Sequence, residues 1–207
     1  MRPHTIDIDV VDESTTEIAP GLTGAGPWVS TDFTRTAARD SLAHQLSLTS
    51  AAIISAISLT VVGTNPDGDA LSEAITGPNI ATVESTGYFA TVTSITASAT
   101  LGANTMDVGV VDEVASYTFP IDWRSPYACN IAVDVTGTIN FTVQQTFVNV
   151  LDGTAPIWTN ISALASKTAD TDSSASVGAT AIRVITSSYS SGAELQVYSS
   201  QATAPGC

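Results

Sequence analysis

Residues 131–143 read IAVDVTGTINFTV, and this stretch alternates between two kinds of side chain along its whole length. One series is apolar apart from a single glycine: Ile131, Val133, Val135, Gly137, Ile139, Phe141 and Val143. The other is small or polar: Ala132, Asp134, Thr136, Thr138, Asn140 and Thr142. A strand places the two series on opposite faces, whereas a helix would mix Asp134 and Asn140 with the apolar residues. The stretch therefore predicts one long β-strand with a buried face and a solvent face.

Shorter runs of the same kind indicate further strands on both sides of this stretch. They lie at residues 46–49, 57–62, 71–75, 88–95, 106–111, 181–185 and 195–198. Turn sequences separate them, such as GTNPDGDA at 63–70 and GPN at 77–79. We expect SSYSSG at 187–192 to form a hairpin loop, and 152–178 to be mostly loop with one helical turn near 161–165. Strands at roughly ten-residue spacing predict an antiparallel sandwich or barrel.

Composition excludes several other classes of protein. About a quarter of the 207 residues are Ser or Thr, and Lys167 is the single lysine, which disfavours a helical protein. With 43% hydrophobic and 13% charged residues, the chain is too apolar and too weakly charged for a disordered acidic tail. Its net charge of −14 argues against a nucleic-acid binder, because phosphates are bound through Lys and Arg.

The pattern divides the chain into three parts. Residues 1–30 are expected to be an extended N-terminal arm, although Ile6, Ile8 and Val10 alternate with polar residues as an edge strand would. The arm carries the acids Asp7, Asp9, Asp12, Glu13 and Glu17. Residues 31–112 and 113–207 are each expected to form an antiparallel β-sandwich, Ig-like or jelly-roll-like, with VVDE at 110–113 as the link. The fold class is therefore all-β.

An internal similarity connects the two expected sandwiches. ISLTVVGT at 57–64 resembles IAVDVTGT at 131–138, since both alternate and both end in Gly-Thr. Two domains of similar build would give this pattern, but eight residues of strand sequence do not establish a duplication.

Targeting signals and paired cysteines are not a feature of this sequence. The first ten residues, MRPHTIDIDV, lack the basic-then-apolar pattern of a signal peptide, and no apolar run approaches the length of a membrane span. Cys129 and Cys207 lie far apart, which predicts a buried thiol and a free tail thiol, with a bridge within the chain or between copies as the alternative. We expect a chain that is made in the cytosol.

Candidate catalytic residues are few. The histidines are His4, in the expected arm, and His44, which we expect on the surface, solvated or hydrogen-bonded. The sequence has no G-x-S-x-G motif, and no histidine lies near Cys129 in the chain. Paired carboxylates of a hydrolase stay open as an alternative, but the acids cluster in the arm and in turns, including Asp152, Asp170 and Asp172. We therefore predict no catalytic residues and no enzymatic activity.

Metal and cofactor sites are likewise not predicted. Asp67 and Asp69 flank Gly68 in an oxygen-rich loop of the kind that calcium prefers. Their spacing does not match an EF-hand loop, and Asp-Gly is a common hairpin turn, so a turn is the favoured interpretation and a metal site the alternative.

Aromatic and basic residues offer a last candidate site. Trp28, Trp123 and Trp158 each stand beside proline-containing or turn sequence, which favours plugging the end of a sandwich core over binding a sugar. Arg124 and Arg183 are expected to pair with acids, because the chain has so few cations. A glycan-binding surface around these tryptophans and residues 152–178 stays open as an alternative.

Two stretches resemble structural proteins of tailed-bacteriophage virions. The first is LTVVGTNPDGDALSEAITGPNIATVESTGYFATVTSITASA at 59–99. The second is FPIDWRSPYACNIAVDVTGTINFTVQQTFVNV at 119–150, followed by AIRVITSSYSSGAELQVY at 181–198. Together they cover roughly half of the chain, and they are strand and turn patterns with no active-site motif.

The resemblance implies a non-enzymatic, β-rich virion component assembled in the host cytoplasm. Its expected partners are other virion proteins, meaning the major capsid protein or neck and tail proteins, and copies of itself as a homo-oligomer. No nucleic acid, membrane or cofactor is expected. An external capsid decoration or cement protein fits first, because an acidic surface is repelled by packaged DNA. A neck or tail protein and a glycan-binding adhesin are the alternatives.

Overall fold

The fold is described by a computed structural model that covers residues 4–11, 14–122 and 128–201. The chain is all-β, as predicted: within these residues, helical structure is limited to the three-residue 3-10 turns η1 (Val150–Asp152) and η2 (Ser162–Leu164). Two compact units divide it, unit 1 from Met1–Val11 and Ala115–Cys207, and unit 2 from Asp12–Val114. No helix in the described ranges has the length and apolar character needed to cross a membrane.

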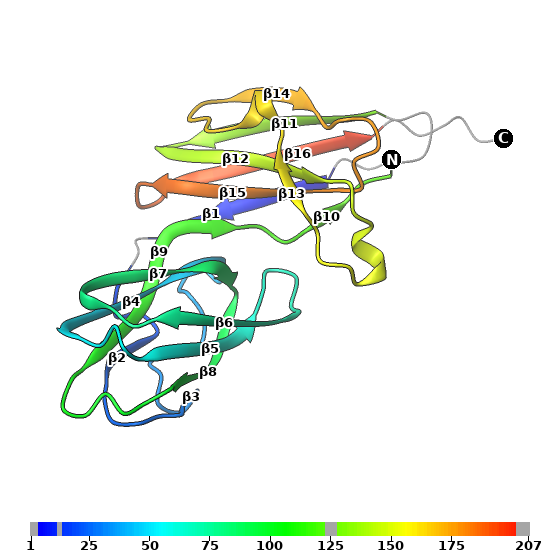
Figure 1. The fold of residues 1–207 in the computed structure, drawn as a ribbon. Helices are drawn as coiled ribbons and strands as arrows, with labels where there is room; N and C mark the ends of the chain where they lie inside the picture. Colours follow the sequence, from blue (N-terminus) through cyan, green and yellow to red (C-terminus); the bar gives the residue numbers. More distant parts are fainter. Residues whose placement is uncertain (1–3, 12–13, 123–127, 202–207) are drawn as a thin grey trace. The chain divides into compact units, whose positions relative to one another are not determined.

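Unit 2 is built from two antiparallel sheets (Figure 1). One sheet has the order β3 (Trp28–Val29), β8 (Thr91–Ala97), β5 (Ser58–Thr64), β6 (Ala70–Thr76). The other has the order β2 (Ala19–Leu22), β9 (Met106–Ala115), β4 (Ala43–Ile53), β7 (Asn79–Phe89). Their inward-facing apolar residues form one core that includes Leu46, Leu48, Leu59, Val61 and Ile95, each at most 1% exposed.

Unit 1 is also a pair of antiparallel sheets. One sheet has the order β1 (His4–Asp9), β16 (Glu194–Gln201), β11 (Cys129–Thr136), β14 (Thr171–Ser174). In the other, β12 (Ile139–Thr146) lies between β13 (Trp158–Asn160) and β15 (Ala181–Tyr189), and β10 (Phe119–Pro120) also pairs with β15. The alternation that predicted these strands is confirmed by burial, since Ile131, Val133, Ile139, Phe141 and Val143 are at most 3% exposed.

The single long strand predicted at 131–143 is wrong, because the chain changes sheets within it. β11 and β12 belong to different sheets, and Gly137 stands between them with a φ of +82°. Only glycine adopts that angle without strain, so the backbone turns the corner there. Both sheets contribute their inner faces to one core, which explains why the alternation runs through the corner unchanged.

The hairpin predicted around residues 187–192 is wrong for the same reason. β15 pairs with β12 and β16 pairs with β11, so the connection between β15 and β16 also crosses from one sheet to the other. The two crossings lie side by side, since the Ser190 amide donates to the Thr138 carbonyl over 2.8 Å. The chain thus changes sheets twice at one end of unit 1 (Figure 1).

The separate N-terminal arm expected at residues 1–30 is also wrong. β1 pairs with β16 from His4↔Ser199 to Asp9↔Glu194, and Ile6 and Ile8 are 2% and 1% exposed. β2 and β3 belong to unit 2, where Trp28 is 7% exposed. The alternating Ile6 and Ile8 can leave water only by joining a sheet, and that gain outweighs the acidic composition that suggested a solvated arm. Asp12 and Glu13 lie outside the described residues.

The expected link at 110–113 lies inside a strand. β9 runs from Met106 through Ala115, and the division between the units falls in it, between Val114 and Ala115. Val110, Val111 and Val114 are all buried, so the acids of this segment interrupt an apolar run and do not mark a loop. The predicted helical turn near 161–165 is confirmed as η2, but the surrounding segment also contains β13 and β14.

Candidate functional site

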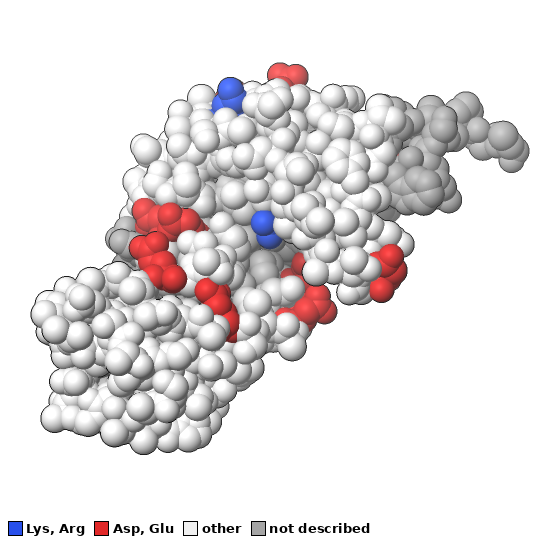
Figure 2. Space-filling model, in the orientation of Figure 1, with Lys and Arg blue, Asp and Glu red and all other residues white. Residues whose placement is uncertain are grey.

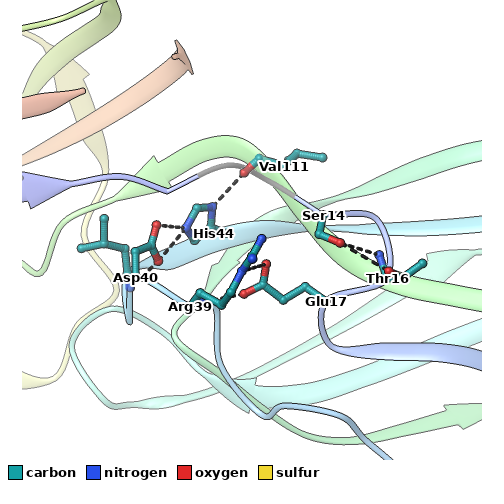
Figure 3. Close-up of polar contacts among 8 residues, drawn as sticks. Ser14, Thr16, Glu17, Arg39, Asp40, His44 and Val111 are labelled. Atoms are coloured by element: carbon teal, nitrogen blue, oxygen red, sulfur yellow. Dashed lines mark hydrogen bonds and ion pairs between the residues drawn. The ribbon is translucent and has the colours of Figure 1, made fainter. Parts of the chain in front are cut away.

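The strongest cluster of ionisable side chains in the described residues lies in unit 2, around His44 (Figure 3). His44 is the second residue of β4, and Asp40 precedes it in a turn where the Ser41 amide donates to the Ala38 carbonyl. The Asp40 carboxylate also accepts the Leu42 amide over 3.0 Å, which holds the side chain back toward β4. The side chains of Asp40 and His44 are each 1% exposed. The prediction of a surface histidine is therefore wrong.

Both ring nitrogens of His44 donate hydrogen bonds. Nδ1 lies 2.8 Å from the Val111 carbonyl oxygen, and Nε2 lies 3.0 and 3.1 Å from the two Asp40 oxygens. A carbonyl and a carboxylate are acceptors, so each nitrogen carries a proton and the ring is an imidazolium. Burial alone would lower the pKa of His44, but the bonds to Asp40 and Val111 and the charges of Asp40 and Glu17 outweigh it, and the pKa is raised.

A second ion pair lies in the same cluster. Glu17, 7% exposed, accepts the Arg39 backbone amide over 2.5 Å and Arg39 Nε over 3.3 Å. The guanidinium is half-exposed, while the carboxylate is buried and fixes the backbone of residues 39–40 beside His44. Ser14, the hydroxyl drawn nearby, is directed toward Thr16, with 3.3 Å between the two hydroxyl oxygens (Figure 3). The cluster ties together the segment before β2, the turn before β4, and β9.

This arrangement is suited to holding structure and not to proton transfer. A general base must offer a lone pair to the proton that it abstracts. His44 has no lone pair left on either nitrogen while it donates to Val111 and Asp40. The sequence signal for the pair was present in Asp40 and His44, four residues apart, but nothing in the sequence showed that a strand and a turn would bury both.

The other predicted candidates are dispersed over the two units. His4 lies in β1, with its ring stacked on Phe119 at 3.9 Å between centroids and its Nε2 2.7 Å from the Tyr117 hydroxyl. Cys129 is fully buried and free, and burial raises its pKa to about 11, so the thiol stays protonated and unreactive. Cys207 lies outside the described residues.

The oxygen-rich loop around Asp67 and Asp69 is a hairpin turn between β5 and β6. The Asn65 carboxamide oxygen accepts the amides of both Asp67 and Asp69 at 2.9 Å, and Gly68 has a φ of +85°. The described part of the chain contains no group of three or more His, Cys, Asp or Glu side chains placed to hold a metal. The interpretation as a turn is confirmed.

Two of the three remaining acids, Asp152 and Asp170, have structural partners. Asp152 accepts the Thr154 amide over 3.0 Å, and this bond holds the pKa of the Asp152 carboxyl below its ordinary value. Asp170 accepts the Val135 amide over 2.9 Å. Asp172 is exposed on β14. Asp170 and Asp172 thus lie at β14, whereas Asp152 lies in η1.

The two tryptophans in the described part of the chain have different environments. Trp28 is buried as predicted, with its indole N–H donating to the Thr23 carbonyl over 3.0 Å. The ring of Trp158 is covered by the Arg183 guanidinium, 4.5 Å above its centroid, and Arg183 also donates to Gln144 over 2.8 Å. Trp123 and Arg124 lie outside the described residues. One ring is thus in the core and another already has a partner.

Comparisons with known proteins give no family for this chain. No protein-family model matches the sequence. No curated protein matches it either. Among solved structures, the chain is similar to one in the structure of infectious bursal disease virus, Gx strain, at 14% sequence identity and a TM-score of 0.18, covering 95% of this chain and 71% of that one. A TM-score this low carries no argument about fold or function.

Proposed function

We propose that this chain is a non-enzymatic structural component of a tailed-phage virion, and that it decorates the outside of the capsid and stabilises the assembled particle. Its partners are the major capsid protein and further copies of itself. A position in the neck or tail is the alternative within the same class. The proposal rests on where the residues that resemble phage structural proteins lie in the fold.

Those residues form the framework of both units. The stretch at 59–99 supplies nearly all of β5 and the whole of β6, β7 and β8, and β5 pairs with both β6 and β8. The stretches at 119–150 and 181–198 supply β11, β12, β15 and nearly all of β16, which pair with one another in two sheets. A likeness that is carried by paired strands concerns a scaffold, and a scaffold with its buried charges already satisfied fits an assembly role better than a catalytic one.

The distribution of charge supports an external position. Twenty acids face six Lys and Arg residues in the sequence, and acidic groups outnumber basic ones on the face drawn in Figure 2. Most of that face carries neither sign of charge. Such a surface is soluble and is repelled by the phosphates of packaged DNA, whereas an internal component needs cations to neutralise them.

Unit 1 offers a surface through which such a protein could attach. Four large apolar side chains stand exposed on the loop between β12 and β13 and on the loop after β14: Phe147 (52%), Leu151 (81%), Ile157 (73%) and Val177 (80%). The two loops are neighbours, because the Thr180 amide donates to the Thr146 carbonyl over 2.8 Å and the Ser176 amide to Gln145. Large apolar side chains exposed on neighbouring loops are typical of an interaction surface.

Quantification of the protein in purified particles tests the proposal. A copy number comparable with that of the capsid subunits is expected for a decoration protein, and a few copies per particle would place it in the neck or tail. Absence from purified particles contradicts both positions.

A pair of variants locates the contact surface. Leu151→Asp places a charge in the exposed apolar loop and should reduce incorporation into particles, because the carboxylate must be desolvated on docking. Thr154→Asp puts the same charge three residues away on the same loop and serves as the matched control. If Leu151→Asp is incorporated into particles as well as Thr154→Asp and the parent chain are, Leu151 does not contact the capsid.

A further inference from the structure

The outer face of the sheet β1-β16-β11-β14 contains a shallow hollow, whose lining includes Asp172 and Ser174 from the segment 152–178 considered above. It has a volume of about 410 Å³ and lies across β16, β11 and β14. The outward side chains that line it are Asn130, Ala132, Asp172, Ser174, Tyr198 and Ser200. All six are solvent-exposed, so the hollow is open to ligands from the surface.

The register of the strands explains why the sheet is hollowed here. Ala132 pairs with Tyr198 on one side and with Asp172 on the other, so a methyl group lies between two longer side chains. In the next row, Asn130 lies between Ser200 and Ser174, whose side chains are short. Neighbouring side chains on one face of a sheet stand about 5 Å apart, so a small residue between larger ones leaves a gap.

The groups around this gap are of two kinds. Tyr198 is 39% exposed, and its hydroxyl donates to the Gln196 side chain, two residues away on the same strand. Opposite it, Asp172 offers acceptors, and Asn130 together with the two serines offers both donors and acceptors. An exposed aromatic ring beside hydrogen-bonding side chains matches a sugar, which has an apolar C–H face and hydroxyl groups around its edge.

We propose that this hollow binds a neutral saccharide, with a sugar ring packed on Tyr198 and its hydroxyls hydrogen-bonded to Asp172 and Asn130. Charge decides against other ligands. No cation is among the residues that line the hollow, and its one charged group is a carboxylate, so phosphates and acidic sugars are repelled. Apolar ligands are disfavoured because Ala132 and the ring of Tyr198 are the only outward apolar groups that they could bury here.

An open hollow with a single aromatic platform binds weakly. We expect a dissociation constant on the order of 1 mM for one copy, because few contacts are fixed and much of the sugar stays in water. If the chain is arrayed on a particle, as proposed above, many copies reach a polysaccharide together and the combined affinity is far higher. Only this gain from the array rests on the proposed function; binding by the isolated chain does not.

The test is a titration of the purified full chain with neutral oligosaccharides of glucose, galactose and N-acetylglucosamine, followed by amide NMR. We expect at least one of them to shift the signals of residues around Ala132 and Tyr198 and to saturate in the millimolar range. Ala132→Phe fills the hollow without removing a polar group and should weaken binding at least tenfold. Thr136→Phe is the matched control, because Thr136 is exposed on the same face of β11 but outside the lining.

Two tyrosine variants separate stacking from hydrogen bonding. Tyr198→Ala should weaken binding about tenfold, as expected for the loss of one packed aromatic ring, whereas Tyr198→Phe keeps the ring and should change it less than threefold. They also keep the test decisive if Ala132→Phe fails to fold. The proposal is overturned if no sugar in the panel binds at a concentration of about ten times the expected dissociation constant. It is also overturned if both Ala132→Phe and Tyr198→Ala bind sugar as the parent chain does. A third contradicting result is that free arginine shifts these NMR signals and the sugars do not. Incorporation into particles would be unaffected by any of these failures.

Discussion

The two units of this chain satisfy their buried polar groups in different ways. Unit 2 buries charges, since Glu17, His44 and the side chain of Asp40 are all withdrawn from water. The buried polar residues described in unit 1 are uncharged: Ser116, Thr142, Gln145, Thr146, Thr186 and Ser199. Unit 2 thus adds buried ionisable groups to the neutral hydrogen bonds of buried residues such as Ser50 and Ser85, and the ionisable groups make its stability depend on pH.

Loop attachment shows the same contrast. In unit 1 the side-chain amide of Gln145 fixes the loop after β14. Its oxygen accepts a hydrogen bond from the Ser176 backbone amide, and its nitrogen donates one to the Ser176 hydroxyl, both at 2.8 Å. In unit 2 the Glu17 carboxylate does the corresponding task by accepting the Arg39 amide. The chain has only six Lys and Arg residues against 20 acids. In unit 2, Arg39 and His44 each lie against a buried carboxylate.

The largest expected effect is confined to unit 1. Deleting residues 1–9 removes β1, with its six register pairs to β16 and the buried side chains of Ile6 and Ile8. Exposing the core that these residues cover should unfold unit 1, because each buried isoleucine contributes about 2–3 kcal/mol. Amide NMR should show native dispersion for unit 2 and its loss for unit 1.

A double variant is the control for this deletion. Asp7→Ala with Asp9→Ala keeps β1 but removes its two exposed carboxylates, and should change stability by less than about 0.5 kcal/mol. If the deleted chain keeps unit 1 folded, β1 is dispensable and the segment is an arm after all.

The second effect belongs to unit 2. Asp40→Asn leaves the buried ring of His44 without its counter-ion and should lower the free energy of unfolding by about 3 kcal/mol, because an unpaired buried charge must be neutralised or exposed. Denaturant unfolding measures it. Asp69→Asn, in the exposed β5–β6 turn, is the matched control and should stay within about 0.5 kcal/mol of the parent chain. If both variants have the same free energy of unfolding, the buried pair of Asp40 and His44 does not stabilise unit 2.

A pH dependence follows from the same pair. The pKa of His44 is raised in the folded chain above the ordinary 6.5 that it takes on unfolding, so the proton favours the folded state. This stabilisation is complete below about pH 6.5 and is lost as the pH rises through the raised pKa. Unfolding measured across this range should show unit 2 weakening toward alkaline pH. His44→Gln should abolish that slope, and His4→Gln in unit 1 should keep it; a slope that persists in His44→Gln contradicts the assignment.

The smallest effect is at the corner of unit 1. Gly137→Ala forces a side chain onto a backbone with a φ of +82° and brings its Cβ to 3.2 Å from the Ala193 Cα, so we expect a loss of about 1–2 kcal/mol. Gly192→Ala is the control, since Gly192 has a φ of +71° but no atom within 4 Å of the added Cβ. Thermal unfolding should place Gly137→Ala below Gly192→Ala; the reverse order would mean that the contact with Ala193 does not matter.

The sequence predicted the strands far better than their arrangement. ISLTVVGT and IAVDVTGT share a pattern of alternation, yet glycine is required in each for a different structural reason. Gly63 lies within β5, where an added Cβ would stand 1.8 Å from the Thr91 carbonyl oxygen, whereas Gly137 supplies the positive φ of a corner. Period-two alternation reports which face of a strand is buried, and it continues unchanged when two sheets share one core, so it does not reveal a change of sheet.

The polar sites were hidden for a similar reason. The pairing of Asp40 with His44 depends on β9 bringing the Val111 carbonyl to the ring from 67 residues away. The hollow on unit 1 depends on Ala132 standing between Tyr198 and Asp172, which only the register of three strands establishes. Composition did indicate a strand-rich chain, and the Asn65–Asp69 turn was predicted correctly because its contacts are local.

The measurement that tests the central claim most directly is an add-back experiment. Particles assembled without this protein are mixed with the purified full chain, separated by sedimentation, and assayed for bound protein and for the temperature at which the capsids open. A capsid decoration protein should bind to saturation and raise that temperature, since a ligand that binds only the intact shell stabilises it. Failure to co-sediment at saturating concentration, with the chain shown to be folded, would contradict the proposed function.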